Sequence, residues 1–124
     1  MVYKEKSYHQ ALSNTGSISP LRFSITNNTN KDKIVILKGV SHSAFQSING
    51  YFCQLINTCY LAYYDSNSVI KDYIYVSDWN DPYTNLNRRV NLKQGEKIDF
   101  SLEPGIGSYR YSRADLIYNI IEDL

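Results

Sequence analysis

The sequence predicts an all-β protein: an antiparallel two-sheet β-sandwich that occupies residues 1–124 as a single domain. Three observations support this prediction. The hydrophobic content of 43% is carried largely by Ile, Val, Leu, Phe and twelve tyrosines, residue types that suit a pleated, half-buried surface. Several segments alternate apolar and polar residues with the period of a strand. Because such strands are wet on one face, a second sheet is needed to cover the other.

The first part of the chain is expected to form an edge strand or a loose arm, followed by a hairpin. Residues 1–20 alternate only weakly and include a turn-forming Ser-Asn-Thr-Gly cluster. Residues 21–26 alternate cleanly, and residues 33–38 are apolar on both sides, so we expect the two to pair across a short polar loop. Residues 39–50 are expected to form a connection that redirects the chain.

The middle of the chain is expected to form the central hairpin. Residues 51–64 have a composition compatible with an extended chain, residues 65–68 supply a turn, and residues 69–77 return as the partner strand. Lys71 and Asp72 place a charge on each face of this strand, which predicts a bulge or an exposed edge.

A loop and then another hairpin are expected next. Residues 78–87 are interpreted as a loop, because Pro82 is incompatible with a central strand. Residues 89–93 and 97–102 each alternate, and Gln94-Gly95 between them predicts the turn of a hairpin.

The C-terminal segment, residues 109–124, is compatible with two structures. Ser112 and Asp115 have the spacing of a capping box, and the apolar residues that follow share a helical face. The run Leu-Ile-Tyr-Asn-Ile-Ile favours a strand instead, and acidic residues at the end oppose a helix dipole. We expect a strand or a short mixed end, with a short C-terminal helix as the alternative.

Composition argues against several functional classes. The net charge of +1, with acids and bases interleaved, gives no basic stripe for a nucleic acid. No apolar run approaches the ~20 residues that cross a bilayer, and the N-terminal residues lack the apolar core of a secretory signal. The sequence therefore predicts a protein made in the cytoplasm without a signal peptide. Cys53 and Cys59 are expected to be free, reduced and partly buried thiols in that compartment.

No catalytic, metal-binding or cofactor-binding signature is recognised. Ser41-His42-Ser43 places hydroxyls beside an imidazole, but neighbours on an extended chain point to opposite faces and no third residue orients the ring. We therefore interpret His42 as an exposed loop histidine rather than part of a hydrolase site. Two histidines and two cysteines lack the paired spacing of a zinc site.

Two charged groups have alternative interpretations. Asp78, Asn80 and Asp81 gather oxygen atoms of the kind that calcium prefers, but short polar side chains in a loop more often bond their own backbone in Asx turns. A positive rim on the late hairpin is expected to be a solvated sheet face, with lipid phosphate or an acidic protein as the minority alternative. Its members are Arg88, Arg89, Lys93 and Lys97.

The aromatic residues carry the most functional information. One small core cannot hold all of them with every hydroxyl satisfied, so some are expected on the surface. Exposed Tyr and Trp suit a lipid headgroup layer, a sugar face or a protein interface, although a codon bias that enriches tyrosine remains an alternative. The residues concerned are Tyr60, Tyr63, Tyr64, Tyr73, Tyr75, Tyr83 and Trp79.

One stretch resembles a known family. Trp79-Asn80-Asp81-Pro82-Tyr83, after a strand at residues 73–76, is similar to a pattern of the aegerolysins and of the small component of binary insecticidal toxins, and more loosely of the actinoporins. Residues 61–65 and 23–29 resemble other strands of that family, so the likeness covers about half of the chain. The Gly-rich turn that aegerolysins place before their central hairpin is absent here.

This resemblance implies a non-enzymatic β-sandwich that binds a membrane lipid or a membrane receptor through aromatic loops. It further implies a larger toxin subunit as a partner in forming a pore, and action at a target-cell membrane after release. The residues assigned to membrane or partner contact are Tyr75, Trp79, Pro82 and Tyr83.

The alternative is a cytoplasmic protein-binding module, such as an immunity protein or inhibitor, that uses a tyrosine-rich sheet face. Surplus aromatics clustered on loops would favour the membrane, whereas aromatics on a sheet face with a charged rim would favour a protein partner.

Overall fold

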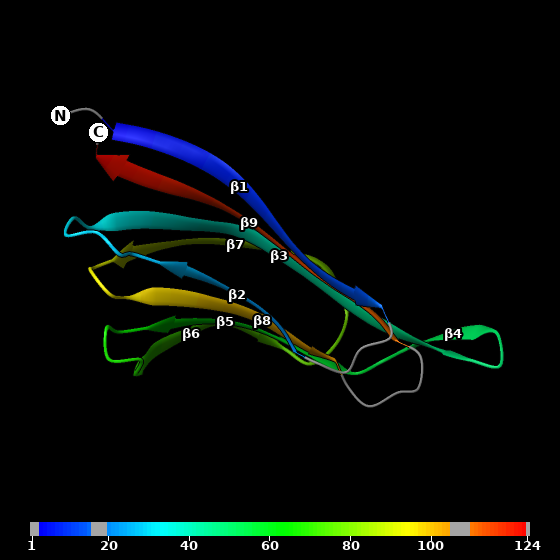
Figure 1. Cartoon of the computed structure of the whole chain (residues 1–124). Helices are drawn as coiled ribbons and strands as arrows, with labels where there is room; N and C mark the ends of the chain where they lie inside the picture. Colours follow the sequence, from blue (N-terminus) through cyan, green and yellow to red (C-terminus); the bar gives the residue numbers. More distant parts are fainter. Residues whose placement is uncertain (1–2, 16–19, 105–109, 124) are drawn as a thin grey trace.

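The computed structural model describes residues 3–15, 20–104 and 110–123, and every regular element in these ranges is a β-strand (Figure 1). The strands form two antiparallel sheets packed face to face, so the predicted β-sandwich is confirmed. Sheet A comprises β1 (Tyr3–Thr15), β9 (Arg110–Asp123), β3 (Lys33–Ile48), β7 (Asp81–Leu92) and β4 (Tyr51–Gln54). Sheet B comprises β2 (Leu21–Thr26), β8 (Lys97–Pro104), β5 (Asn57–Tyr64) and β6 (Ile70–Ser77).

The strand order is that of a jelly roll with one added strand. Sheet A runs β1-β9-β3-β7 and sheet B runs β2-β8-β5-β6. The added strand β4 pairs with β3 on the same side as β7, further along β3. Two four-stranded sheets wound in this order are two interlocked Greek keys. Most chain neighbours therefore lie in opposite sheets, and most pairings join segments far apart in sequence.

Two of the predicted hairpins are wrong for this reason. Residues 21–26 pair with β8 and residues 33–38 with β7 and β9, so the loop between them crosses from one sheet to the other. Residues 89–93 and 97–102 likewise lie in facing sheets, joined by a turn at Gly95. The hairpin of β5 and β6 is confirmed, and β6 is both an edge strand and irregular in register, as its two mid-strand charges predicted.

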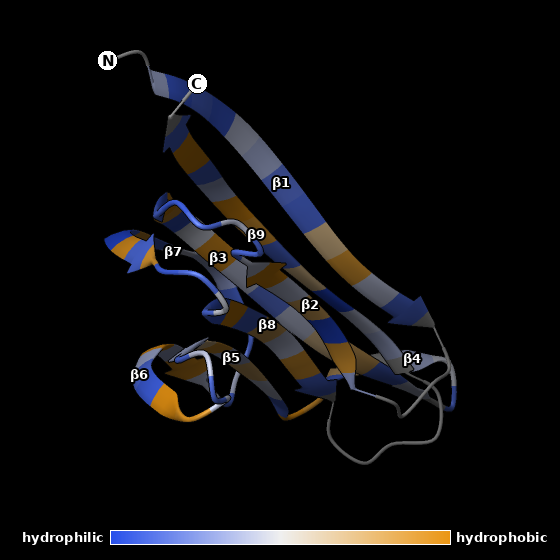
Figure 2. Ribbon diagram, turned by 60° about the vertical axis from the view of Figure 1, so that its left-hand side comes forward, coloured by the Kyte–Doolittle hydropathy of each residue, from blue (hydrophilic) through white to orange (hydrophobic). Residues whose placement is uncertain are grey.

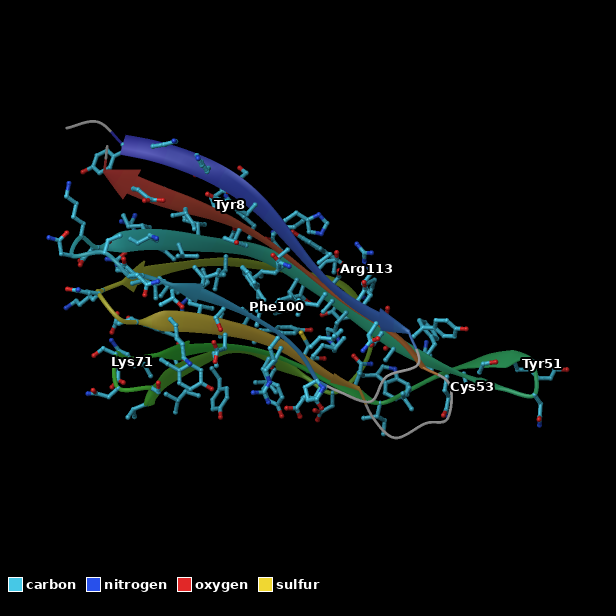
Figure 3. The ribbon with its side chains drawn as sticks, viewed as in Figure 1. Tyr8, Tyr51, Cys53, Lys71, Phe100 and Arg113 are labelled. Atoms are coloured by element: carbon cyan, nitrogen blue, oxygen red, sulfur yellow. The ribbon has the colours of Figure 1, made fainter. Side chains whose placement is uncertain are left out.

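The core lies between the sheets. Alternate residues of each strand are buried, and Figure 2 shows the resulting change between hydrophobic and hydrophilic residues along the ribbons. Phe100 of β8 is the largest fully buried side chain and lies between the two layers (Figure 3). It packs in one cluster with residues of both sheets, among them Leu37, Leu61, Leu92 and Leu116.

The C-terminal segment is a strand throughout its described residues, so the helical alternative is wrong. β9 lies between β1 and β3 and pairs with both along most of its length. Ser112, Ala114, Leu116 and Tyr118 are buried at period two, which a helix would not produce. Residues 3–15 likewise form an edge strand, β1, and not a loose arm; residues 1–2 and 16–19 of the predicted segment lie outside the described residues.

β3 continues where a connection was predicted. It runs through a bulge between Leu37 and Gly39 and on to Ile48, so residues 39–48 belong to the strand. Asn49 and Gly50 then both have positive φ and turn the chain into β4. An Asn-Gly pair is the preferred two-residue hairpin turn. The hairpin projects beyond the sandwich, with Tyr51 near its tip (Figure 3).

Candidate functional site

The candidate site is built around the β6–β7 loop, residues 78–80, which carries the chain's single tryptophan. Three hydrogen bonds hold the first half of this loop. Ser77 Oγ donates to the Trp79 carbonyl (3.1 Å). The backbone N–H of Asn57 donates to the backbone carbonyl of Asp78 (3.3 Å), and Thr58 Oγ1 donates to Asp78 Oδ1 (3.0 Å). The loop is therefore tied to the start of β5.

Asn80 ties the second half of the loop to the interior. Its Oδ1 accepts hydrogen bonds from the Ala44 amide (2.9 Å) and from Asn57 Nδ2 (2.6 Å). Asn57 is 1% exposed, and its Nδ2 also donates to the Leu55 carbonyl (2.9 Å). One buried amide side chain thus joins β5 to the loop.

His42 extends this network across the sandwich. Its Nδ1 lies 2.5 Å from Asn57 Oδ1 and its Nε2 lies 3.0 Å from the Tyr75 hydroxyl. Because Asn57 Nδ2 donates elsewhere, its Oδ1 is an acceptor and His42 Nδ1 is the donor of that bond. The Tyr75 hydroxyl donates its one proton to Asp81 Oδ2 (2.8 Å), and the Thr84 hydroxyl donates to the same oxygen.

Burial and hydrogen bonds both shift pKa values in and beside this network. Burial, reinforced by Asp81, raises the pKa of Tyr75 to about 12, so the phenol stays protonated. Burial raises the pKa of Cys59 to about 12 as well, which keeps this core thiol unreactive. Burial also acts to raise the pKa of Asp81, but hydrogen bonds from Thr84, Tyr75 and the Tyr83 amide outweigh it and the net shift is downward.

A hollow of about 380 Å³ opens beside the loop, on the face of sheet A turned away from sheet B. It exists because β7 and β4 pair with the same edge of β3 and leave a gap between them. On that edge, His42 of β3 pairs with Asp81 of β7, and the next pairing along β3 is that of Phe45 with Gln54 of β4. The Asn80 side chain covers the gap by accepting a hydrogen bond from the Ala44 amide. The residues that line the hollow are Ser41, His42, Ser43, Phe45, Gln54, Trp79, Asn80, Asp81, Pro82, Arg113 and Asp115.

Charged residues of β9 form one wall of the hollow (Figure 3 labels Arg113). Arg113 Nε and Nη2 donate to the two carboxylate oxygens of Asp115, both at 2.9 Å. His9 Nε2 of the neighbouring strand β1 lies 2.7 Å from Asp115 Oδ1. Burial acts to raise the pKa of Asp115, but Arg113 and His9 outweigh it and lower the pKa overall.

A second hollow, of about 430 Å³, lies on the opposite, outer face of sheet B. Tyr60, Tyr64 and Tyr73 line it together with charged and hydroxyl side chains of β2 and β8. These charged residues are Arg22, Lys97, Asp99 and Glu103. The structure therefore places surplus aromatics both at a loop and on a sheet face.

The four residues assigned to contact have different environments. Trp79 is 48% exposed and lines the sheet A hollow with Pro82. Pro82 belongs to β7, so the prediction of a loop to residue 87 is wrong; it sits in a register irregularity on an edge strand, where a missing amide is tolerated. Tyr83 is 51% exposed and its phenol occupies the position that a β-carbon would take at Gly39. Tyr75 lies inward, in the buried network.

Several chemical interpretations from the sequence are corrected. His42 is 2% exposed within β3, not an exposed loop residue, and its ring nitrogens contact Asn57 and Tyr75 and neither adjacent serine. The Asx prediction for Asp78 and Asn80 is wrong, because both side chains bond other segments. Within the described ranges, no group of three or more His, Cys, Asp or Glu side chains is arranged to hold a metal ion.

The cysteines and the positive rim lie in the following environments. Cys53 and Cys59 are both free, the first exposed and the second buried. The positive rim is partly neutralised, since Arg88 pairs with Asp72 and Lys97 lies 3.7 Å from Asp99. None of the described residues lies in a helix with the length and apolar character needed to cross a bilayer.

Sequence reasoning missed Phe45, Gln54, Arg113 and Asp115 as members of the site. They come from three strands, and only the register of β3 with β4 and β9 brings them beside the loop. The usable signals were the single tryptophan and the Ser-His-Ser alternation, which places both serines on the outer face.

Comparisons with known proteins give distant structural likenesses. No family model and no curated protein matches the sequence. Among solved structures, the Drosophila NLP-core, described for pentamer formation and histone binding, is 16% identical with a TM-score of 0.48; the match covers 91% of this chain and 97% of that one. The infectious bursal disease virus Gt strain structure is 8% identical with a TM-score of 0.46 over 95% of this chain. The match spans about a third of that viral chain (33%). Likeness at this level assigns no function.

Proposed function

We propose that this protein is a non-enzymatic attachment module that binds a membrane-bound target, lipid or receptor, through the surface around Trp79. This is the role that the aegerolysin resemblance implies, and there it includes the recruitment of a larger toxin subunit. Affinity would come from burial of aromatic and apolar area and from a few directed hydrogen bonds, with no bond made or broken.

One observation carries the proposal: a half-exposed indole on a loop that is fixed from both sides. Hydrogen bonds from β5, β3 and Ser77 hold residues 78–80, while Trp79 is left 48% exposed. The exposed half of this indole contributes nothing to the core. In a complex it contributes contact area at a small cost in conformational entropy.

Co-sedimentation tests this proposal. The wild type and Trp79→Ala are mixed with vesicles of phosphatidylcholine, of phosphatidylcholine with an anionic lipid, and of sphingomyelin with cholesterol, and with membranes prepared from cells. We expect the wild type to sediment with at least one of these preparations and Trp79→Ala to lose most of that binding. Tyr73→Ala is the matched control, because Tyr73 is an exposed aromatic on sheet B.

Two results would contradict the proposal. The first is binding that is equal in the wild type and Trp79→Ala. The second is the absence of wild-type binding to any vesicle or membrane preparation.

A second function is favoured by the hollow on sheet B. Three tyrosines on a sheet face, rimmed by two cations and two anions, form the kind of surface expected for a protein-binding module. Under this alternative Tyr73→Ala with Tyr60→Ala would abolish capture of a protein partner, and Trp79→Ala would not. Comparing Trp79→Ala with the Tyr60→Ala/Tyr73→Ala double variant therefore distinguishes the two functions.

A further inference from the structure

We propose that the hollow beside Trp79 is a carbohydrate site that takes a neutral pyranose residue of a glycan. This inference rests on the proposed function and specifies its target as a glycan displayed on a membrane. It is argued from the lining of the hollow, its charge and its rigidity.

The lining of the hollow combines an apolar wall with unpaired polar groups. Phe45, Trp79 and Pro82 supply the apolar part. The hydroxyls of Ser41 and Ser43 and the Gln54 amide line the same hollow, and none of these three side chains bonds another residue in the described ranges. A pyranose presents a flat apolar face and a rim of hydroxyls, which matches an aromatic wall with donors and acceptors beside it.

The size of the hollow suits one or two sugar rings. Its volume of about 380 Å³ lies at the lower end of the roughly 300–1,000 Å³ found for small-ligand sites. It lies on the outer face of sheet A, so a longer glycan could continue outward from the bound ring.

The charge of the hollow argues for a neutral sugar. The Arg113 guanidinium is held by both oxygens of Asp115, and Asp81 adds another carboxylate to the lining. No unpaired cation therefore remains in the lining to receive a sialic or uronic acid. The same charges oppose insertion into a bilayer, because burying the Arg113–Asp115 pair in lipid would cost its hydration.

The rigidity of the hollow supports a preformed site. Sugars bind weakly per contact, so a site that must order itself first would lose much of the available free energy. Here Asn80 and Asp78 are already bonded to β3 and β5, and Trp79 needs no reorganisation of its loop.

Fluorescence of the single tryptophan tests the inference directly, because Trp79 is the only indole in the chain. The protein is titrated with the methyl glycosides of glucose, galactose, mannose, N-acetylglucosamine and N-acetylgalactosamine up to ~10 mM, enough to saturate a site of millimolar affinity or tighter. N-acetylneuraminic acid and glucuronic acid form the acidic arm. We expect a saturable change in emission with at least one neutral glycoside and none with the acids.

Variants assign the binding to the hollow. Trp79→Ala, followed by calorimetry, and Gln54→Ala, followed by fluorescence, are each expected to weaken binding about tenfold, equivalent to ~1.4 kcal/mol. Tyr3→Ala, which removes an exposed aromatic of β1 outside both hollows, is expected to bind as the wild type does. Binding of the acidic sugars only, or neutral-sugar binding that Trp79→Ala leaves unchanged, would overturn the inference.

The outcomes separate this inference from the proposed function. If no glycoside binds while membrane attachment still depends on Trp79, the carbohydrate assignment is overturned and the attachment role stands. If neither glycosides nor membranes bind, both are overturned.

Discussion

Glu96 is a buried carboxylate, 5% exposed, in the turn between β7 and β8. It accepts hydrogen bonds from the Tyr63 hydroxyl (2.6 Å), the Lys93 amide (2.9 Å) and Lys71 Nζ (3.1 Å). Burial acts to raise its pKa, but these donors outweigh burial and lower the pKa overall. The folded protein therefore stabilises the ionised form of Glu96 more than the unfolded chain does.

Acid is therefore expected to weaken the fold through Glu96. A pKa lowered from 4.5 means that the stabilisation is complete above about pH 4.5 and is lost as the pH falls through the folded pKa. We expect Glu96→Gln to lower the free energy of unfolding by about 1–3 kcal/mol at pH 7. Urea titrations at pH 7 and pH 3 should show the gap to the wild type closing in acid, with the exposed Glu103→Gln as control. A gap that is constant with pH would contradict this account.

Position 39 requires glycine because the Tyr83 side chain leaves no room for a β-carbon, and not because of its backbone angles. The Tyr83 phenol fills the space of a β-carbon, so Gly39→Ala must displace the ring. We expect a loss of about 1 kcal/mol of unfolding free energy, the lower end of the cost of overpacking, because the half-exposed ring has room to move away. In a Tyr83→Ala background the same change should cost much less. Equal costs in both backgrounds, measured by urea denaturation, would show that Tyr83 is not the obstacle.

Among the elements, the β6–β7 loop depends most on one distant residue, Asn57 of β5. Its side chain contacts His42, the Leu55 carbonyl and Asn80 at once. Asn57→Ala is expected to lower the unfolding free energy by about 1–3 kcal/mol, because buried partners lose their hydrogen bonds. It should also release the loop and lower the fluorescence anisotropy of Trp79. Thr58→Ala, which removes one exposed bond, should change both quantities less; an equal effect would contradict the central role of Asn57.

The elements also show where sequence reasoning succeeds and where it stops. Alternation identified most strands and their buried faces, because burial on one side leaves a local pattern. Strand pairing leaves no local pattern in the sequence when consecutive strands belong to opposite sheets. The hairpins predicted for residues 21–38 and 89–102 are wrong for this reason. The same limit applies to the site: Trp79 and Pro82 were identified from local chemistry, whereas Arg113 and Gln54 join them only through register.

For the whole molecule, the jelly roll separates the chain ends from the candidate site. β1 and β9 pair along their length, with Tyr3 opposite Asp123, so these two described ends lie together at one end of the sandwich (Figure 1). The β3–β4 hairpin projects from the other end, and the β6–β7 loop contacts β3 at Ala44, shortly before that hairpin. An attachment surface placed there lies at the end of the sandwich opposite to Tyr3 and Asp123.

The most direct test of the attachment surface is acrylamide quenching of Trp79, with and without the membranes to which the protein binds. In the free protein the half-exposed indole should be readily quenched. On attachment we expect the quenching constant to fall to about half or less, because the contact removes the indole from water. Quenching that stays unchanged while the protein is fully bound would show that attachment occurs elsewhere, and would contradict the account.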